Sequence, residues 1–373
     1  MEFINLKAQY QYLKKEIDAG IEKVISKTNF IMGEDVRLFE EQLASYVGRK
    51  YAISCSDGTA ALQLIYMAYN IGAGDAVFCP DMTFIASVEP AVMLGATPIF
   101  CDIDSVSYNI CVESLERQIQ FVLKEGKLRP RAIVAVDFIG NPADYDALMQ
   151  IAKKYDLILI EDAAQGIGAL YKGKKCGSFG DVAATSFFPS KPLGCYGDGG
   201  AVFTDDDKLA ELLNSLKVHG KGESKYDNQR IGINSRLDTL QAAILSVKLN
   251  KLDEEMEKRQ HVAMVYDNAL KDYFQIPDIA EENRSSYAQY ALLAHNREHR
   301  NECISILKEN DIPSIIYYPN PLHSMKVFEN CIIGNESFKN TIDYAERTFS
   351  IPFSAYVTKE EQEKIIEVLK KCI

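Results

Sequence analysis

The sequence predicts an α/β fold built on a mostly parallel sheet of seven strands with helices on both faces. Two observations support this prediction. Short apolar segments recur through the first two thirds of the chain, and most are nearly continuous, as in strands buried on both faces. Helical patterns separate several of these segments, and such strand–helix alternation is typical of a parallel sheet.

The individual elements follow from local patterns. The strand candidates are residues 52–55, 76–79, 98–101, 132–136, 157–160, 183–187 and 201–204. Helical patterns fall at residues 59–69, 113–124 and 144–155. A Ser-x-x-Asp sequence at Ser235 is a helix-start signal, and high helix propensity then continues to about residue 270. We expect one long helix there, of the kind that bridges two domains.

The last third of the chain indicates a smaller α+β unit. Segments 289–294, 305–309 and 315–318 are followed by a helical pattern over 359–371. A length of 373 residues allows two or three domains. We therefore expect an N-terminal helical segment (1–30) packed on the small domain, a large domain (31–249) and a small C-terminal domain (250–373).

Composition restricts the function classes. The hydrophobic fraction of 47% is ordinary for a globular protein, so disorder is excluded. Lys and Arg number 41 against 53 Asp and Glu, and this net charge of −12 disfavours nucleic-acid binding. The nine cysteines are widely spaced without a CxxC pair, which favours reduced thiols in the cytoplasm. We find no signal-peptide pattern and no apolar run of about 18 residues, so we expect no membrane partner.

A small-residue turn follows the first predicted strand. Ser56-Asp57-Gly58-Thr59 opens directly onto a predicted helix. Free backbone N–H groups and the positive end of the helix dipole favour an anion there, and the Thr59 hydroxyl adds a donor. The turn therefore predicts a phosphate site, with a simple capped helix as the alternative.

Two further strand ends carry charged groups. Glu161 and Asp162 end the apolar segment 157–160, and buried acids are costly unless they are paired or used. Lys191 lies between two prolines after segment 183–187, a position that lowers a lysine pKa and favours a Schiff-base role. The alternatives are a capping acid and a lysine that extends to solvent.

These three sites together match the needs of pyridoxal 5'-phosphate. In open α/β sheets, ligands bind beyond the carboxyl ends of the strands, where all three sites lie. The phosphate would dock on the helix N-terminus, Asp162 would hold the pyridine nitrogen protonated, and Lys191 would carry the aldehyde. The order and spacing of the three predict this cofactor.

The segment 217–236 concentrates positive charge in an acidic protein. Against only Glu223 and Asp227 it carries the basic residues Lys217, His219, Lys221, Lys225, Arg230 and Arg236. We expect these cations to serve an anionic ligand, with a disordered surface loop as the alternative.

Seven motifs resemble the DegT/StrS-type sugar-nucleotide aminotransferases, over nearly the whole chain. They are Gly58-Thr-Ala-Ala-Leu62, Asp81-Met-Thr-Phe84, Glu161-Asp-Ala-Ala-Gln165, Ser186-Phe-Phe-Pro-Ser-Lys191, Gly199-Gly-Ala201, Gly232-Ile-Asn-Ser-Arg-Leu-Asp238 and Tyr318-Pro-Asn-Pro-Leu-His323. The resemblance implies a fold-type-I PLP transferase, a homodimer whose active sites lie at the subunit interface.

The resemblance also implies residue roles. Lys191 would be the Schiff-base lysine, Asp162 would pair with the pyridine nitrogen, Gln165 would approach the phenolic oxygen and Phe84 would stack on the ring. Gly58, Thr59 and Ser186 would hold the phosphate, and Asn234 would reach the phosphate of the neighbouring subunit's cofactor. Arg230, Tyr318 and His323 would face the sugar nucleotide. Asp57 departs from the family pattern, because an acid beside a phosphate is unfavourable unless it points away.

The implied activity is a ping-pong transamination from L-glutamate to a nucleotide-linked keto-sugar. Lysine at position 191 favours amino transfer, because family dehydratases carry histidine there. The segment 186–201 is most similar to the branch acting on UDP-linked 2-acetamido-3-keto-hexuluronates, which would make an amino sugar for surface glycans. Two alternatives stay open: a UDP- or GDP-linked 4-keto-6-deoxy sugar as substrate, and a non-catalytic PLP-fold binding or regulatory protein.

Two weaker patterns point elsewhere. His295, His299 and Cys303 are spaced by four residues, but His295 falls in a strand-like segment before the helix, so we expect no metal site. Gly166-Ile-Gly168 is an incomplete dinucleotide fingerprint that starts too far from its strand. An NAD-dependent oxidoreductase is therefore the weaker alternative.

Overall fold

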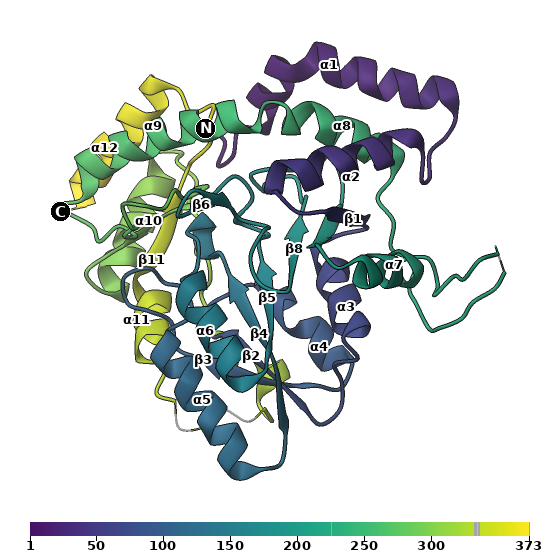
Figure 1. Cartoon of the computed structure of the whole chain (residues 1–373). Coiled ribbons are helices and arrows are strands. Elements are labelled where there is room, and N and C mark those ends of the chain that lie inside the picture. Colours follow the sequence, from purple (N-terminus) through teal and green to yellow (C-terminus); the bar gives the residue numbers. More distant parts are fainter. Residues whose placement is uncertain (225, 332–333, 335, 373) are drawn as a thin grey trace.

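A seven-stranded sheet forms the centre of the computed structural model, which describes residues 1–224, 226–331, 334 and 336–372 (Figure 1). Its strand order is β1 (Tyr51–Cys55), β9 (Gly200–Thr204), β8 (Val182–Ser186), β5 (Ile158–Asp162), β4 (Arg129–Val136), β2 (Asp75–Pro80) and β3 (Thr97–Cys101). The pairs from β8 to β3 are parallel, and β9 runs antiparallel to both neighbours. The predicted mostly parallel sheet and its seven strands are confirmed.

Both faces of the sheet are buried, which explains the continuous apolar strands. Val77 and Cys79 of β2 join one core cluster, while Ala76 and Phe78 of the same strand join another. The first cluster packs against α3 (Gly58–Ala68), α4 (Glu89–Met93) and α7 (Asp207–Leu216). The opposite face packs against α2 (Glu34–Val47), α5 (Val112–Glu125), α6 (Tyr145–Tyr155) and α8 (Thr239–Leu249).

The N-terminal helix α1 (Leu6–Lys27) lies along α8 at the outside of the molecule (Figure 1). The Asn5 side chain caps it by accepting a hydrogen bond from the Ala8 N–H at 3.0 Å. Near its start, the Gln9 amide donates to the Glu255 carboxylate at 2.9 Å. The helix therefore contacts both α8 and the beginning of the next helix.

The predicted long helix after Ser235 is two helices, so that expectation was wrong. Helix α8 begins at Thr239, because Asp238 is still extended, and α9 (Leu252–Leu270) begins after a break at Asn250 and Lys251. Ser235 does not cap the helix. Its hydroxyl accepts a hydrogen bond from the Ser56 N–H at 3.1 Å, which ties this segment to the turn after β1.

The C-terminal part is a smaller α+β unit around a two-stranded sheet. Strand β10 (Tyr290–Leu293) pairs antiparallel with β11 (Thr348–Ile351). They pack with α9, α10 (Arg297–Glu309) and α12 (Lys359–Leu369) in one apolar cluster. The expected segment 315–318 contributes only an isolated bridge from Ile315 to Ser350, and β11 was not predicted.

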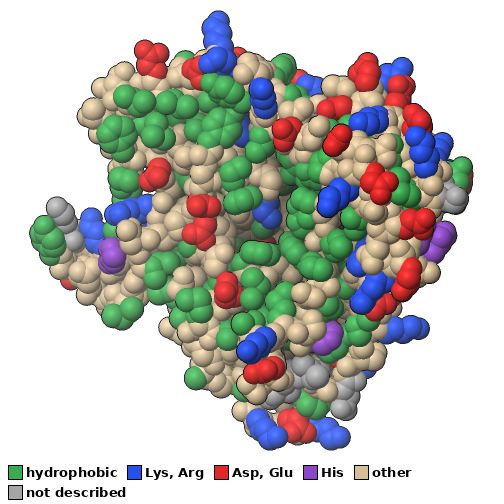
Figure 2. All heavy atoms as spheres, turned by 180° about the vertical axis from the view of Figure 1, so that it is seen from behind, with side chains coloured by type: hydrophobic (Ala, Val, Ile, Leu, Met, Phe, Trp, Pro, Cys, Tyr) green, Lys and Arg blue, Asp and Glu red, His purple; other side chains and the backbone are tan. Residues whose placement is uncertain are grey.

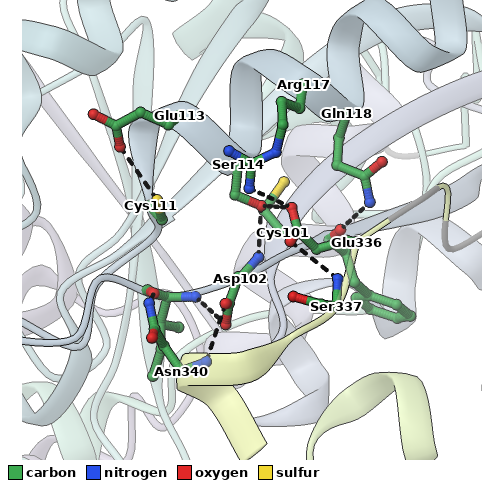
Figure 3. Close-up of polar contacts among 12 residues, drawn as sticks. Cys101, Asp102, Cys111, Glu113, Ser114, Arg117, Gln118, Glu336, Ser337 and Asn340 are labelled. Carbon is green, nitrogen blue, oxygen red and sulfur yellow. Dashed lines mark hydrogen bonds and ion pairs between the residues drawn. The ribbon is translucent and has the colours of Figure 1, made fainter.

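A buried acid of the large domain caps the start of helix α11 (Lys339–Arg347) (Figure 3). Asp102 follows β3, and its carboxylate accepts hydrogen bonds from the backbone N–H groups of Asn340 at 3.1 Å and Thr341 at 2.8 Å. Glu336 reaches Ser114 and Arg117 of α5 beside it. Asp102 thus supplies the cap that α11 lacks within its own segment.

Short elements complete the described chain. They are the hairpin β6 (Leu170–Tyr171) and β7 (Lys174–Lys175), and the 3-10 turns η1 (Ile85–Ser87), η2 (Phe138–Gly140), η3 (Leu322–Ser324), η4 (Lys326–Phe328) and η5 (Lys370–Cys372). Among the described residues, no helix has the length and apolar character needed to cross a bilayer.

Candidate active site

One cavity of about 370 Å³ opens beyond the carboxyl ends of the parallel strands. Eight of the residues singled out from the sequence line it: Gly58, Thr59, Phe84, Asp162, Gln165, Ser186, Lys191 and Tyr318. They come from five separate motifs of the chain, and the convergence of the strand ends brings most of them together. Arg230, Asn234 and His323 do not line this cavity.

The turn before α3 forms one wall of the cavity. Asp57 is the N-cap of α3, because its Oδ1 accepts the Ala60 N–H at 2.8 Å, so its charge is directed at the helix backbone. A Cβ added at Gly58 would lie 2.7 Å from the Ser186 Cβ, which explains the glycine. The remaining N–H groups of this first turn have no partners within the helix and can receive an anion.

Asp162 ends β5 and is buried at the floor of the cavity. Its Oδ2 accepts a hydrogen bond from the Ser87 hydroxyl at 2.7 Å, and its Oδ1 accepts the Ala164 N–H at 3.1 Å. Burial raises the pKa of Asp162, while Ser87 and Ala164 oppose that rise. Ser87 was missed by sequence reasoning, although Thr83, whose hydroxyl lies 2.9 Å from it, belongs to a quoted motif.

Lys191 reaches the same cavity from the turn after β8. Its backbone N–H donates to the Phe188 carbonyl at 2.8 Å, and the Cys195 N–H closes the loop onto the Phe187 carbonyl at 2.8 Å. Desolvation lowers the pKa of the Lys191 ammonium, while the charge of Asp162 opposes that shift. The amine is therefore held on a hydrogen-bonded turn, and its neutral, nucleophilic form costs less free energy to reach than in an exposed lysine.

Aromatic rings form part of the cavity lining. The Phe84 and Tyr318 ring centroids lie 6.0 Å apart, and Tyr318 lies 6.3 Å from Phe138. Phe84 is 52% exposed although it lines the cavity, so a flat ligand could cover it. Gln165 is oriented by its Oε1, which accepts the Ile139 N–H at 2.7 Å.

Three residues that were predicted to contact substrate or cofactor lie outside the cavity lining. Arg230 is exposed and donates to the Ser215 hydroxyl at 2.6 Å. Asn234 is exposed and forms an isolated bridge with Val218. His323 has its Nδ1 2.5 Å from an Asp81 carboxylate oxygen and stacks on Phe338.

The expectation that Lys217 serves an anionic ligand was wrong. Its ammonium is buried and pairs with the Glu40 carboxylate at 3.1 Å and the Ser54 carbonyl at 3.0 Å. A count of charges along one segment cannot show an acid contributed by α2. Lys225, which belongs to the same set, lies outside the described residues.

The two weaker patterns have structural explanations. His295 precedes α10, and its backbone N–H donates to His299 Nδ1 at 3.2 Å. Gly166 and Gly168 form a turn rather than a helix start, and a Cβ at Gly168 would lie 2.7 Å from the Met256 sulfur. A dinucleotide fingerprint needs a helix at this point, so its context is missing.

The lining residues fit pyridoxal phosphate. A helix N-terminus suits a phosphate, a buried carboxylate suits a ring nitrogen, an amine of lowered pKa suits an aldehyde, and an exposed ring suits a flat heterocycle. A side chain at position 58 would collide with Ser186 and fill the space before α3. The glycine keeps this space open.

Comparison with known proteins assigns a family. The sequence model of the DegT/DnrJ/EryC1/StrS aminotransferase family matches residues 11–370. A UDP-2-acetamido-2-deoxy-3-oxo-D-glucuronate aminotransferase from Pseudomonas aeruginosa is 43% identical over 360 residues, covering 96% of each chain. A dTDP-3-amino-3,6-dideoxy-alpha-D-galactopyranose transaminase from Aneurinibacillus thermoaerophilus is 38% identical, covering 99% of this chain and 98% of that one.

Solved structures agree. A DegT DnrJ EryC1 StrS aminotransferase from Brucella abortus superposes with a TM-score of 0.97 at 44% identity, covering 100% of this chain and 99% of the other. NtdA from Bacillus subtilis, solved with bound cofactor PMP, superposes with a TM-score of 0.87 at 26% identity, covering 96% of this chain and 82% of its own.

Proposed function

Because this chain belongs to the DegT/DnrJ/EryC1/StrS aminotransferase family, we propose that it transfers the amino group of L-glutamate to a UDP-linked 2-acetamido-3-keto-hexuluronate. The chain is a sugar aminotransferase, and the cofactor of its chemistry is pyridoxal 5'-phosphate. The observation that carries the proposal is the meeting of Gly58, Asp162 and Lys191 at one cavity.

In the proposed site, each residue has one task. Thr59, Ser186 and the N–H groups of the first turn of α3 bind the phosphate. Asp162 holds a proton on the ring nitrogen, and Phe84 and Gln165 orient the ring. The bound cofactor supplies an electron sink for the carbon that loses its proton.

Lys191 moves the proton in this proposal. In the first half-reaction its Nζ takes the proton from Cα of glutamate, which requires the neutral amine. Lys191 would pass that proton to the cofactor carbon that bore the aldehyde, and in the second half-reaction it would take it back and give it to the carbon that carried the keto group. Desolvation lowers the pKa of Lys191, so less free energy is needed to reach the neutral form before it acts as a base.

The substrate proposal rests on similarity to relatives. The relatives named above act on a 3-oxo-glucuronate or make a 3-amino sugar, which supports a keto group at position 3. The similarity of segment 186–201 to the hexuluronate branch supports the same choice over a 4-keto-6-deoxy sugar. We propose an amino sugar for surface glycans as the product.

We also propose a homodimer with shared active sites. Among the described residues that line the cavity, Lys191 is the only lysine or arginine, while Asp57, Asp162 and Asp198 are acids. Phosphate, diphosphate and uronate groups need more positive charge than that. The segment after α7 extends from the body of the molecule with Arg230 and Asn234 exposed on it (Figure 1), and a second copy could supply it.

A second feature supports association of two copies. Apolar side chains gather on the face that carries α1 (Figure 2). Ile25 is 53% exposed at the end of this helix, and Phe30, Ile31 and Met32 are exposed just after it. An apolar surface of this kind is typical of an interface. A molar mass of one chain by light scattering would contradict the dimer.

Substrate screening by mass spectrometry tests the function. Holoenzyme with L-glutamate should aminate the UDP-linked 3-keto-hexuluronate and leave UDP- and GDP-linked 4-keto-6-deoxy sugars largely unchanged. The reverse preference would replace the substrate, and cofactor binding without product from any sugar would favour a regulatory protein.

A single substitution tests the proposed base. Lys191→Ala should lower turnover by about 10²–10⁴-fold or more, because it removes the proton-transfer group. The matched control is Lys174→Ala, which changes an exposed lysine on β7 and should keep normal turnover. Normal turnover by Lys191→Ala would end the proposal.

A further inference from the structure

The acid beside Asp162 has no task in the proposed reaction. Glu161 lies on the opposite face of β5 and is fully buried. Asp137, at the end of β4, is also fully buried, and carboxylate oxygens of the two residues and the Cys176 sulfur all lie within 4.8 Å of one another. Two ionised carboxylates this close in an apolar enclosure repel strongly, so the pair must hold a proton or a cation.

Hydrogen bonds show where a proton fits. Both oxygens of Glu161 already accept backbone N–H groups, from Gly177 at 2.6 Å and from Phe179 at 2.7 Å. On Asp137, Oδ1 accepts both the Tyr145 hydroxyl at 2.6 Å and the Ala143 N–H at 3.2 Å, whereas Oδ2 is buried and has no partner. A proton on Oδ2 would give that atom a hydrogen bond to donate toward Glu161.

The surroundings favour a proton over a metal ion. The Glu161 oxygens are engaged with backbone donors, and a Cβ at Gly166 would lie 2.1 Å from Asp137 Oδ2, so the chain closes tightly over the pair. The other groups that face the pair are the Tyr145 hydroxyl from α6 and the Cys176 thiol. Burial raises the pKa of both, which keeps them protonated.

We infer that Asp137 is protonated at Oδ2 and donates a hydrogen bond to the Glu161 carboxylate, and that this acid pair is a positioning device for the cofactor site. Gly166, in the turn that carries Gln165, packs against the Asp137 carboxylate. The Asp137 backbone N–H donates to the Asp162 carbonyl at 3.2 Å. The pair thereby fixes the ends of β4 and β5, from which Asp162 reaches the cavity. This inference rests on the proposed role of Asp162.

The pKa shifts support a shared proton without locating it. Burial raises the pKa of Asp137 to about 7 and the pKa of Glu161 well above its usual range. The larger rise at Glu161 would by itself favour a proton there. Hydrogen-bond donors lower the pKa of both acids, Gly177 and Phe179 at Glu161, and Tyr145, Ala143 and Cys176 at Asp137. The placement therefore rests on Oδ2 of Asp137, the carboxylate oxygen of the pair that receives no donor among the described residues. The pair titrates as a unit, so substitution rather than titration separates the two cases.

Two isosteric substitutions should differ in their effect on cofactor binding. Asp137→Asn replaces the O–H by an N–H that can still point at the Glu161 carboxylate. Glu161→Gln places an NH₂ group against the N–H of Gly177 or Phe179, so two donors face each other. The holoenzyme of Asp137→Asn should keep its cofactor absorbance and bind the cofactor within about threefold of wild type, since one neutral donor replaces another. Glu161→Gln should bind it about tenfold or more weakly, the effect of a buried donor without an acceptor.

An infrared measurement reports the protonated carboxyl group directly, independently of changes in stability. Wild-type holoenzyme at pH 7 should show the infrared C=O band of a protonated, buried carboxyl group, and Asp137→Asn should lose that band while remaining folded. A tolerated Glu161→Gln with a damaged Asp137→Asn would move the proton to Glu161 and overturn the assignment. Unfolding of Asp137→Asn, or a metal ion bound in stoichiometric amount to wild type, would also overturn it.

The experiment distinguishes this inference from the proposed function. The carboxyl band depends on the acid pair alone, so it should persist in Lys191→Ala. Inactive Lys191→Ala with an intact band agrees with both proposals. Active Lys191→Ala with an intact band would remove the proposed reaction and leave the proton assignment in place.

Discussion

At the scale of single residues, the charge of Asp162 depends on two donors that meet it in a buried position. Burial alone would favour the neutral acid, which could not hold a proton on a ring nitrogen. The Ser87 hydroxyl and the Ala164 N–H lower the pKa of Asp162 again. In the proposed site, Ser87 would therefore affect the cofactor through Asp162, as a positioning residue.

Removal of this hydroxyl should weaken cofactor binding. Ser87→Ala takes one hydrogen bond from a buried carboxylate, an interaction that contributes about 1.5–3 kcal/mol, so the cofactor Kd should rise about tenfold or more. The pKa of Asp162 should rise, and the cofactor absorbance should become pH-dependent at higher pH than in wild type. Fluorescence titration with the cofactor and an absorbance pH series measure both effects.

Ser305→Ala is the matched control, because Ser305 is exposed on α10 and its hydroxyl donates to the Glu309 carboxylate at 3.4 Å. An unchanged Kd and an unchanged pH series for Ser87→Ala would show that Asp162 needs no hydroxyl partner.

The sequence was sufficient for the residues that lie at strand ends. Asp162, Lys191 and Gly58 could be placed together because parallel strands direct their carboxyl ends to one edge. Ser87 could not, because it lies on η1, away from a strand end, and isolated serines are common. The assignment of Lys217 failed because its partner Glu40 is remote in sequence.

At the scale of elements, α11 depends on a side chain from another part of the fold. The N-cap position of α11 is Phe338, which offers no side-chain oxygen. Asp102 supplies the acceptors instead. One carboxylate oxygen accepts the Asn340 N–H (Figure 3), and the other accepts the N–H and the hydroxyl of Thr341. Tyr344 and Ala345 also pack α11 into the core of the large sheet, while Asp102 satisfies the backbone N–H groups at the start of the helix.

Loss of this acid should loosen α11 without altering the cavity. Asp102→Ala leaves buried N–H groups without acceptors, which costs about 1–3 kcal/mol of the free energy of unfolding. Asp102→Asn should cost less, because its amide oxygen still accepts. Urea unfolding measures the difference, and protease cleavage near α11 should increase.

Glu113→Ala is the control, since it changes an exposed acid at the start of α5. Equal stability of Asp102→Ala and Glu113→Ala would mean that water replaces the carboxylate without cost.

Element types were predictable where the apolar pattern is long or both faces are buried. All seven strands of the large sheet follow from their apolar runs. The break between α8 and α9 was not visible, because Asn250 and Lys251 are compatible with a helix and tertiary packing decides. Strand β11 is only four residues long and exists through its pairing with β10.

At the scale of the whole molecule, an acidic chain contains a buried lysine outside the cavity. The formal net charge is −12, yet Lys248 of α8 is buried. Its ammonium donates to the Gly194 carbonyl at 2.6 Å and lies 4.4 Å from the centre of the Tyr196 ring. These contacts do not replace the lost water, and desolvation lowers the pKa of Lys248 to about 8. The stability of the whole fold should therefore depend on pH through this residue.

The direction follows from proton counts in the two states. Below pH 8 Lys248 is protonated in both the folded and the unfolded chain, and the full cost of burying its charge is present. Between pH 8 and the ordinary value of 10.5, the unfolded chain binds a proton that the folded chain lacks. The free energy of unfolding should rise there by about 1.4 kcal/mol per pH unit from this group, and level off above it.

Lys248→Met tests this by removing the titrating group while keeping a chain of similar length. Urea unfolding of wild type and variant at one protein concentration, from pH 7 to pH 11, should show the variant more stable by up to about 3 kcal/mol at pH 7 and equal near pH 11. Lys191 shifts in the same direction in both proteins, so its contribution cancels in the difference. Parallel curves would mean that Lys248 keeps an ordinary pKa, and that the Gly194 carbonyl and the Tyr196 ring compensate fully for its burial.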